Sequence, residues 1–76
     1  MTYGELKRRI ENGEQIRARI YRGRRTGTLS IAEGLGTLWL NFDGAKRLGT
    51  EITEDNGAWA SLELKDADGR YGRNAA

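Results

Sequence analysis

The spacing of apolar residues changes at Gly13, and this change limits the possible folds more than any other feature of the chain. Before Gly13, the apolar residues Tyr3, Leu6 and Ile10 recur at the intervals of one helix face. After it, apolar and polar residues alternate along most of the chain, as they do in half-buried strands. The sequence therefore predicts an α+β protein that is mainly β, with a short N-terminal helix.

The predicted helix has sequence signals at both ends. Thr2 and Glu5 have the spacing of a capping box, in which a hydroxyl and a carboxylate satisfy backbone N–H groups at the helix start. Asn12 and Gly13 form a stop signal, because glycine readily adopts the left-handed conformation that ends many helices. We therefore expect the helix to end at this pair.

The rest of the chain has the composition of short strands joined by tight turns. Eleven glycines disfavour further long helices, because a glycine inside a helix is destabilising. The segments that read as strands are residues 15–21, 26–32, 37–42, 48–53 and 58–65. In the last segment, Trp59 and Glu63 are expected to face outward. We predict a four- to five-stranded antiparallel meander, either closed into a small SH3-like barrel or open with the helix packed across one face.

The length and the distribution of apolar residues predict one domain. Residues 1–66 contain every predicted element and form the compact domain, whereas residues 67–76 are expected to be a flexible tail. No apolar run approaches the ~18 residues of a membrane-spanning helix, and the N-terminus lacks the apolar core of a signal peptide. We therefore expect a cytoplasmic protein with no membrane partner.

The residue types argue against catalysis and against a cofactor. The chain has no Cys and no His, which removes disulfides, the usual zinc ligands and the common catalytic triads. The glycine pairs at 23–27 and 34–36 lack the strand–loop–helix context of a phosphate-binding loop. We expect a protein that is not an enzyme and carries no cofactor or metal.

The charges are divided along the chain, and this division points to partners. Residues 1–30 hold eight Lys or Arg against three Asp or Glu, whereas residues 31–69 hold three against eight. The basic half concentrates its charge in Arg17, Arg19, Arg22, Arg24 and Arg25. Ten Arg stand against three Lys in the whole chain, and the planar fork of arginine favours bidentate contacts with phosphate or carboxylate. This excess of arginine over lysine favours recognition of a partner's phosphate or carboxylate groups. Alternatively, Arg17 and Arg19 could pair with Glu51, Glu54 or Glu63 within the protein.

A second sheet face emerges once the Leu, Ile and Phe side chains are assigned to the core. This face carries Arg17, Arg19, Tyr21, Trp39 and Trp59 among hydroxyl and amide side chains. Aromatic rings beside arginine are typical of single-stranded nucleic-acid platforms and also of protein–protein hot spots. The alternative is that the helix covers this face and buries both tryptophans. Arg22, Arg24 and Arg25 crowd a predicted turn and are expected to project beyond the sheet.

The chain resembles two kinds of known protein, one in its order of elements and the other in its size and composition. A capped helix followed by five candidate strands resembles the layout of Sm-like RNA-binding ring proteins. Those proteins place an Asp and an Asn beside the third strand, a pattern that residues 39–44 do not reproduce, so ring assembly and uridine binding do not carry over. In size and composition the chain is similar to small accessory proteins of phages and other mobile elements, including anti-CRISPR inhibitors. That resemblance implies a short, non-enzymatic protein that occupies a surface of a nucleoprotein complex.

These observations predict a small binding protein that engages nucleic acid or a nucleic-acid-handling complex. The predicted contact residues are Arg17, Arg19, Tyr21, Arg22, Arg24, Arg25 and Trp39. One alternative is an interaction domain that forms a homo-oligomer through its tryptophan-bearing face. Another is an acidic surface, built from the carboxylates of the second half, that imitates nucleic acid.

Overall fold

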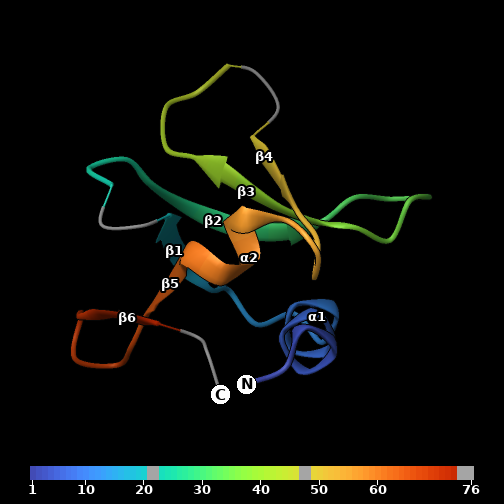
Figure 1. Cartoon of the computed structure of the whole chain (residues 1–76), viewed down its shortest axis with the longest axis horizontal. Coiled ribbons are helices and arrows are strands. Elements are labelled where there is room, and N and C mark those ends of the chain that lie inside the picture. Colours follow the sequence, from blue (N-terminus) through green and yellow to red (C-terminus); the bar gives the residue numbers. More distant parts are fainter. Residues whose placement is uncertain (21–22, 47–48, 74–76) are drawn as a thin grey trace.

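The chain forms a curled antiparallel sheet with one helix packed against it (Figure 1). The structure is a computed structural model, and it describes residues 1–20, 23–46 and 49–73. Within these ranges the elements are α1 (Tyr3–Glu11), β1 (Arg17–Ile20), β2 (Thr26–Ile31), β3 (Leu38–Phe42), β4 (Thr50–Ile52), α2 (Gly57–Ser61), β5 (Leu62–Lys65) and β6 (Tyr71–Arg73). The prediction of a mainly β protein with an N-terminal helix is confirmed.

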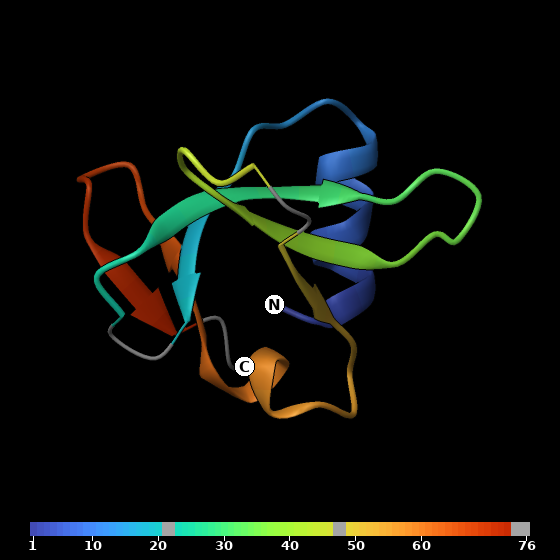
Figure 2. The same cartoon turned by 90° about the horizontal axis from the view of Figure 1, so that it is seen from above.

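The predicted antiparallel meander is present, and two further strands extend it on one side. The strands lie in the order β4-β3-β2-β1-β5-β6, and every neighbouring pair is antiparallel. The first four strands follow one another as expected, but β5 returns to the far side of β1, which therefore lies inside the sheet. Figure 2 shows how strongly the sheet curls. Among the described residues β4 and β6 remain the two edges, so the sheet is a half-barrel with six strands rather than a closed barrel of four or five.

The N-terminal helix has the predicted caps. The hydroxyl of Thr2 accepts a hydrogen bond from the backbone N–H of Glu5 and donates one to the Glu5 carboxylate. Gly13 follows the helix with a φ of 93°, the left-handed conformation in which glycine is not strained. The local sequence therefore sets both ends of α1.

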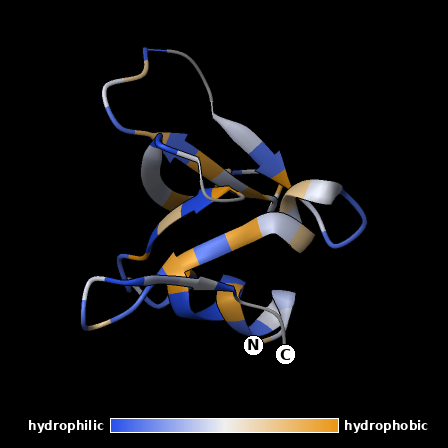
Figure 3. Ribbon diagram, turned by 60° about the vertical axis from the view of Figure 1, so that its left-hand side comes forward, coloured by the Kyte–Doolittle hydropathy of each residue, from blue (hydrophilic) through white to orange (hydrophobic). Residues whose placement is uncertain are grey.

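The concave face of the sheet carries the core. Its buried apolar residues are Leu6, Ile16, Ala18, Leu29, Leu38, Leu40, Ile52 and Leu62. These are the residues that the alternation of period two assigns to one face, joined by one residue of α1. Figure 3 shows apolar and polar residues alternating along the strands, with hydrophilic loops between them.

The strand predicted over residues 58–65 is wrong in its first half. Residues Gly57–Ser61 form the short helix α2, and only Leu62–Lys65 form a strand. The side chain of Asn56 accepts a hydrogen bond from the backbone N–H of Trp59, which is an N-cap that starts the helical turn. An alternating pattern in a short Ala-rich segment does not distinguish the two structures, and the cap decided for the helix.

The segment expected to be a tail contains a strand. Residues Tyr71–Arg73 pair with β5, and a turn that holds Gly69 at a φ of 83° connects the two strands. The carboxylate of Asp66 accepts hydrogen bonds from the backbone N–H groups of Asp68 and Arg70, which fixes this turn. Residues 74–76 lie outside the described part of the chain. Within that part, no helix is long and apolar enough to cross a membrane.

Candidate nucleic-acid interface

The convex face of the sheet places the strand arginines beside hydroxyl and amide side chains. In the strand register, Arg17 lies opposite Thr28, and Thr28 lies opposite Asn41. Arg19 lies between Thr26 of β2 and Glu63 of β5. Residues directly opposite each other in antiparallel strands share a face, so these side chains form one polar surface.

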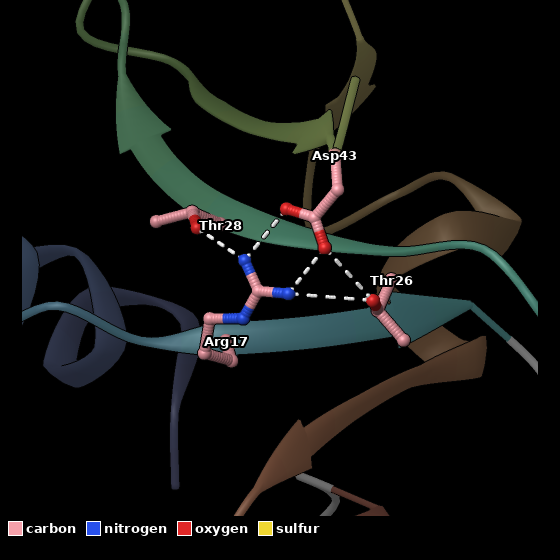
Figure 4. A network of polar contacts seen from close by, with 4 residues as sticks. All are labelled: Arg17, Thr26, Thr28 and Asp43. Atoms are coloured by element: carbon pink, nitrogen blue, oxygen red, sulfur yellow. Dashed lines mark hydrogen bonds and ion pairs between the residues drawn. The ribbon is translucent and has the colours of Figure 1, made fainter. Parts of the chain in front are cut away.

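Arg17 is held by a network that joins three segments (Figure 4). One guanidinium nitrogen donates to the Asp43 carboxylate at 2.7 Å and to the Thr28 hydroxyl at 2.9 Å. The other donates to the second carboxylate oxygen of Asp43 and to the Thr26 hydroxyl. Thr26 in turn donates to Asp43 at 3.0 Å. Both oxygens of Asp43 are therefore occupied, and the bidentate geometry suits the guanidinium group.

The network changes the acidity of Asp43. Hydrogen bonds from Arg17, and then from Thr26, lower the pKa of its carboxyl group from 3.8 to about 2. The same contact with Asp43 raises the pKa of the Arg17 guanidinium. The pair therefore stays charged at neutral pH, and the positive charge of Arg17 is balanced within the protein.

Arg19 is balanced in the same way, in a less exposed position. Its Nε donates to the Glu63 carboxylate at 2.6 Å, and the Glu63 side chain is only 11 % exposed. The guanidinium carbon of Arg19 lies 4.6 Å from the centre of the Tyr71 ring, which is a cation–π contact. The pairing with Glu63 is one of the alternatives that the sequence left open.

The turn arginines have a different environment. Arg24 and Arg25 are exposed and have no carboxylate partner among the described residues. The guanidinium carbon of Arg25 lies 4.3 Å from the centre of the Phe42 ring. Lys46, in the loop that follows β3, is also exposed and without a described ion-pair partner. Because Gly27 pairs with Phe42 in the sheet, both loops emerge from the same end of the sheet.

We call the three residues Arg24, Arg25 and Lys46 the basic end. Tyr21 and Arg22, which were predicted to contribute to this turn, lie outside the described residues. The basic residues of α1 do not extend the patch, because Figures 1 and 2 show α1 and the turn on opposite sides of the molecule.

The two tryptophans do not share a face. Trp39 lies on the convex face between Ser30 and Glu51, and its indole N–H donates to the Thr37 hydroxyl at 2.9 Å. Trp59, expected to face outward, instead packs against the core from α2. Its ring makes an edge-to-face contact with Tyr3 at a centroid distance of 5.2 Å.

Sequence reasoning offered Glu63 as a partner for the strand arginines but missed the other groups that neutralise or support the arginines. Asp43 was read as a turn residue and as one carboxylate of the possible acidic surface, and Phe42 only as a core residue. The register places Phe42 near the turn before Thr26, but no local pattern signals that contact. Tyr71 was assigned to a tail, because a three-residue strand is too short to show alternation.

Comparisons with known proteins give no relative for this chain. No protein-family model, no curated protein and no solved structure matches it. No group of three or more acidic, His or Cys side chains able to hold a metal ion occurs among the residues that the structure describes.

Proposed function

We propose that this chain is a non-enzymatic binding module that contacts the phosphate groups of nucleic acid through its basic end. The observation that carries the proposal is the pair Arg24 and Arg25, exposed at one turn with no described carboxylate to neutralise them. Guanidinium groups without a carboxylate partner retain their capacity for bidentate phosphate contacts. Lys46 adds a third positive charge at the same end of the sheet.

The support of Arg25 by Phe42 favours binding. A guanidinium group stacked on a ring keeps its N–H groups free around its edge, where an anion can approach. Its position is also restricted before binding, so less side-chain entropy is lost when a phosphate is bound. The strand arginines give the proposal less support, because Arg17 and Arg19 already have carboxylate partners.

The environment of the aromatic rings favours backbone contacts over base stacking. Arg25 covers Phe42 and Arg19 covers Tyr71, so each ring has a face already in use. Trp39 lies beside Glu51, whose charge would repel the phosphates of a strand stacked there. We therefore propose the duplex backbone as the main ligand, recognised without strong sequence preference.

The experiment is a titration of short duplex DNA and RNA at several salt concentrations. If two or three phosphates are neutralised, the logarithm of affinity falls with the logarithm of salt with a slope of about −2 to −3. The variant R24E/R25E should abolish binding at low salt. The matched control is R70E, which reverses one positive charge in the loop between β5 and β6. That loop lies at the opposite end of β1 and β5 from the turn that carries Arg24 and Arg25.

One other outcome of this titration has a defined meaning, and a separate experiment tests self-association. No binding to any oligonucleotide at low salt would contradict direct nucleic-acid recognition. A protein partner within a nucleic-acid-handling complex, as in a phage-type inhibitor, would then be the better proposal. Self-association through the Trp39 face is tested by sedimentation, where a concentration-dependent mass that W39A removes would favour an interaction domain.

A further inference from the structure

The two edges of the sheet differ in how they are covered. At β4, the side-chain amide of Asn56 donates to the backbone C=O of Glu51 at 2.9 Å, and α2 lies against the strand. At β6, no described segment pairs with the outer side of the strand. Figure 1 shows β6 on the side of the sheet away from β4. Because an uncovered edge can pair with another extended chain, β6 is the edge open to a partner.

The hydrogen-bond pattern of the β5–β6 hairpin shows which backbone groups of β6 face outward. The backbone N–H of Asp66 donates to the C=O of Arg70 at 2.8 Å, so these two residues form a hydrogen-bonded pair. Bonded and non-bonded pairs alternate in an antiparallel ladder, which makes Gly72 the next residue of β6 that bonds to β5. The N–H and C=O groups of Tyr71 and Arg73 therefore point away from β5.

The side chains of β6 divide between the two faces of the sheet. Gly72 lies opposite Leu64, which packs against the core, so this position faces the concave side. Arg73 lies opposite Glu63, on the convex face that also carries Arg19. A strand added beside β6 would alternate in the same way and would meet two different environments.

The concave side offers room for an apolar side chain. A pocket of about 500 Å³ lies beside Gly72, and Leu64 and Met1 contribute apolar surface to it. A Cβ built at Gly72 meets no other atom within 4 Å, so glycine leaves this space open. Arg9 also lines the pocket, but its guanidinium is bound to the Glu14 carboxylate.

The convex side offers a positive charge at one end of the edge. Arg73 is exposed and has no ion-pair partner among the described residues. Glu63, which lies opposite it, is bonded to Arg19 at 2.6 Å. At the other end of β6, the carboxylate of Asp66 accepts two backbone N–H groups of its own turn. An acidic side chain is therefore favoured opposite Arg73 rather than near the loop.

We propose that the β6 edge binds an extended segment of a partner protein, which adds to the sheet as an antiparallel strand. An apolar residue of this segment lies beside Gly72, and the residue before it is acidic and lies opposite Arg73. Backbone hydrogen bonds to Tyr71 and Arg73 supply affinity, and the alternate side chains supply specificity. This site is separate from the basic end and does not depend on the proposed nucleic-acid function.

The test adds the blocked peptide acetyl-STEFTST-amide to the full chain and follows backbone amides by NMR. We expect saturable shifts and slower hydrogen exchange at the amides of Tyr71 and Arg73. A methyl group on the glutamate nitrogen of the peptide removes an N–H that faces β6, and should weaken binding about tenfold or more. A methyl group on the phenylalanine nitrogen, which faces away, is the matched control and should have a much smaller effect.

Changes of side chain test the two environments. G72V fills the concave space and should weaken binding of the peptide about tenfold or more. R73Q should weaken it about threefold, and should leave the affinity for acetyl-STQFTST-amide unchanged, because that peptide has no charge to lose. R24Q, which neutralises a cation at the basic end, is the matched control and should bind both peptides like the parent.

Several results would overturn the proposal. The absence of saturable shifts at Tyr71 and Arg73 would reject the site. Equal binding of the two methylated peptides would reject strand addition, and full binding by folded G72V would reject the place of the apolar residue. Equal affinity of the parent for the glutamate and glutamine peptides would reject the acidic preference. If G72V gives no dispersed NMR spectrum, the methylated peptides decide, because they leave the protein unchanged.

Discussion

The strand arginines and the turn arginines are neighbours in sequence and opposites in electrostatic environment. Arg19 contacts a carboxylate that is 11 % exposed and a tyrosine ring, whereas Arg24 is exposed and has no described partner. The difference follows from position in the sheet. β1 lies between β2 and β5, so its side chains meet residues from both neighbours, while Arg24 and Arg25 precede β2 and belong to no strand pair.

This comparison separates two uses of the same residue type. Arginines inside the sheet stabilise the fold by joining segments that are distant in sequence. Arg24 and Arg25 at the turn are exposed and have no described carboxylate partner, so we expect their replacement to change stability little. If this separation holds, substitutions in the two regions should affect different measurements.

The largest expected effect is on stability, at Arg19. Replacing it with methionine, R19M, removes a charge-assisted hydrogen bond to the little-exposed Glu63 and should lower the free energy of unfolding by about 2 kcal/mol. R24M and R25M should each stay within about 0.5 kcal/mol of the parent. Urea unfolding monitored by tryptophan fluorescence measures all three.

A double substitution is the control for this first prediction. In R19M/E63M both charges are absent, so most of the lost stability should return. Equal destabilisation by R19M and R24M would remove the distinction between the regions.

The next effect is on binding, at the turn. R24Q/R25Q should weaken duplex binding about tenfold at low salt and make the salt slope shallower by about 2. R17Q should leave the slope nearly unchanged, because that guanidinium is already paired with Asp43. Fluorescence anisotropy of a labelled duplex measures both. A slope that depends equally on Arg17 would place the strand arginines in the interface.

A smaller effect concerns acid stability. The folded pKa of Asp43, about 2, is below its ordinary value, so ionised Asp43 favours the folded state. This contribution is fully present above about pH 4 and is lost as the pH falls through about 2. In D43N the loss of stability between these pH values should be smaller than in the parent, as measured by thermal unfolding at each pH. D55N, at an exposed loop position, is the matched control.

The smallest effect concerns the Phe42 ring. F42L keeps an apolar side chain but removes the cation–π contact with Arg25, and should weaken duplex binding about twofold. Y71L removes the corresponding contact of Arg19 and should leave duplex binding unchanged, since Arg19 is neutralised by Glu63. Competition titrations with one labelled duplex resolve differences of this size.

Much of the fold could be predicted because its signals are local. The cap formed by Thr2, the left-handed Gly13 and the alternation from Leu38 to Phe42 depend on residues within one or two turns. The failures also have local causes. The Asn56 cap competes with a strand pattern at Trp59, and β6 is too short for its period to be visible.

The candidate site was less predictable, because its electrostatics depend on pairings across the sheet. By itself, the sequence determined that a cluster of arginines would span a strand and the turn after it. Only the tertiary structure decided which of them were neutralised. Asp43 is 26 positions from Arg17, and Glu63 is 44 positions from Arg19. The pairing of β1 with β5 and the turn after β3 bring these carboxylates to the strand arginines, and no described segment does the same for Arg24 or Arg25.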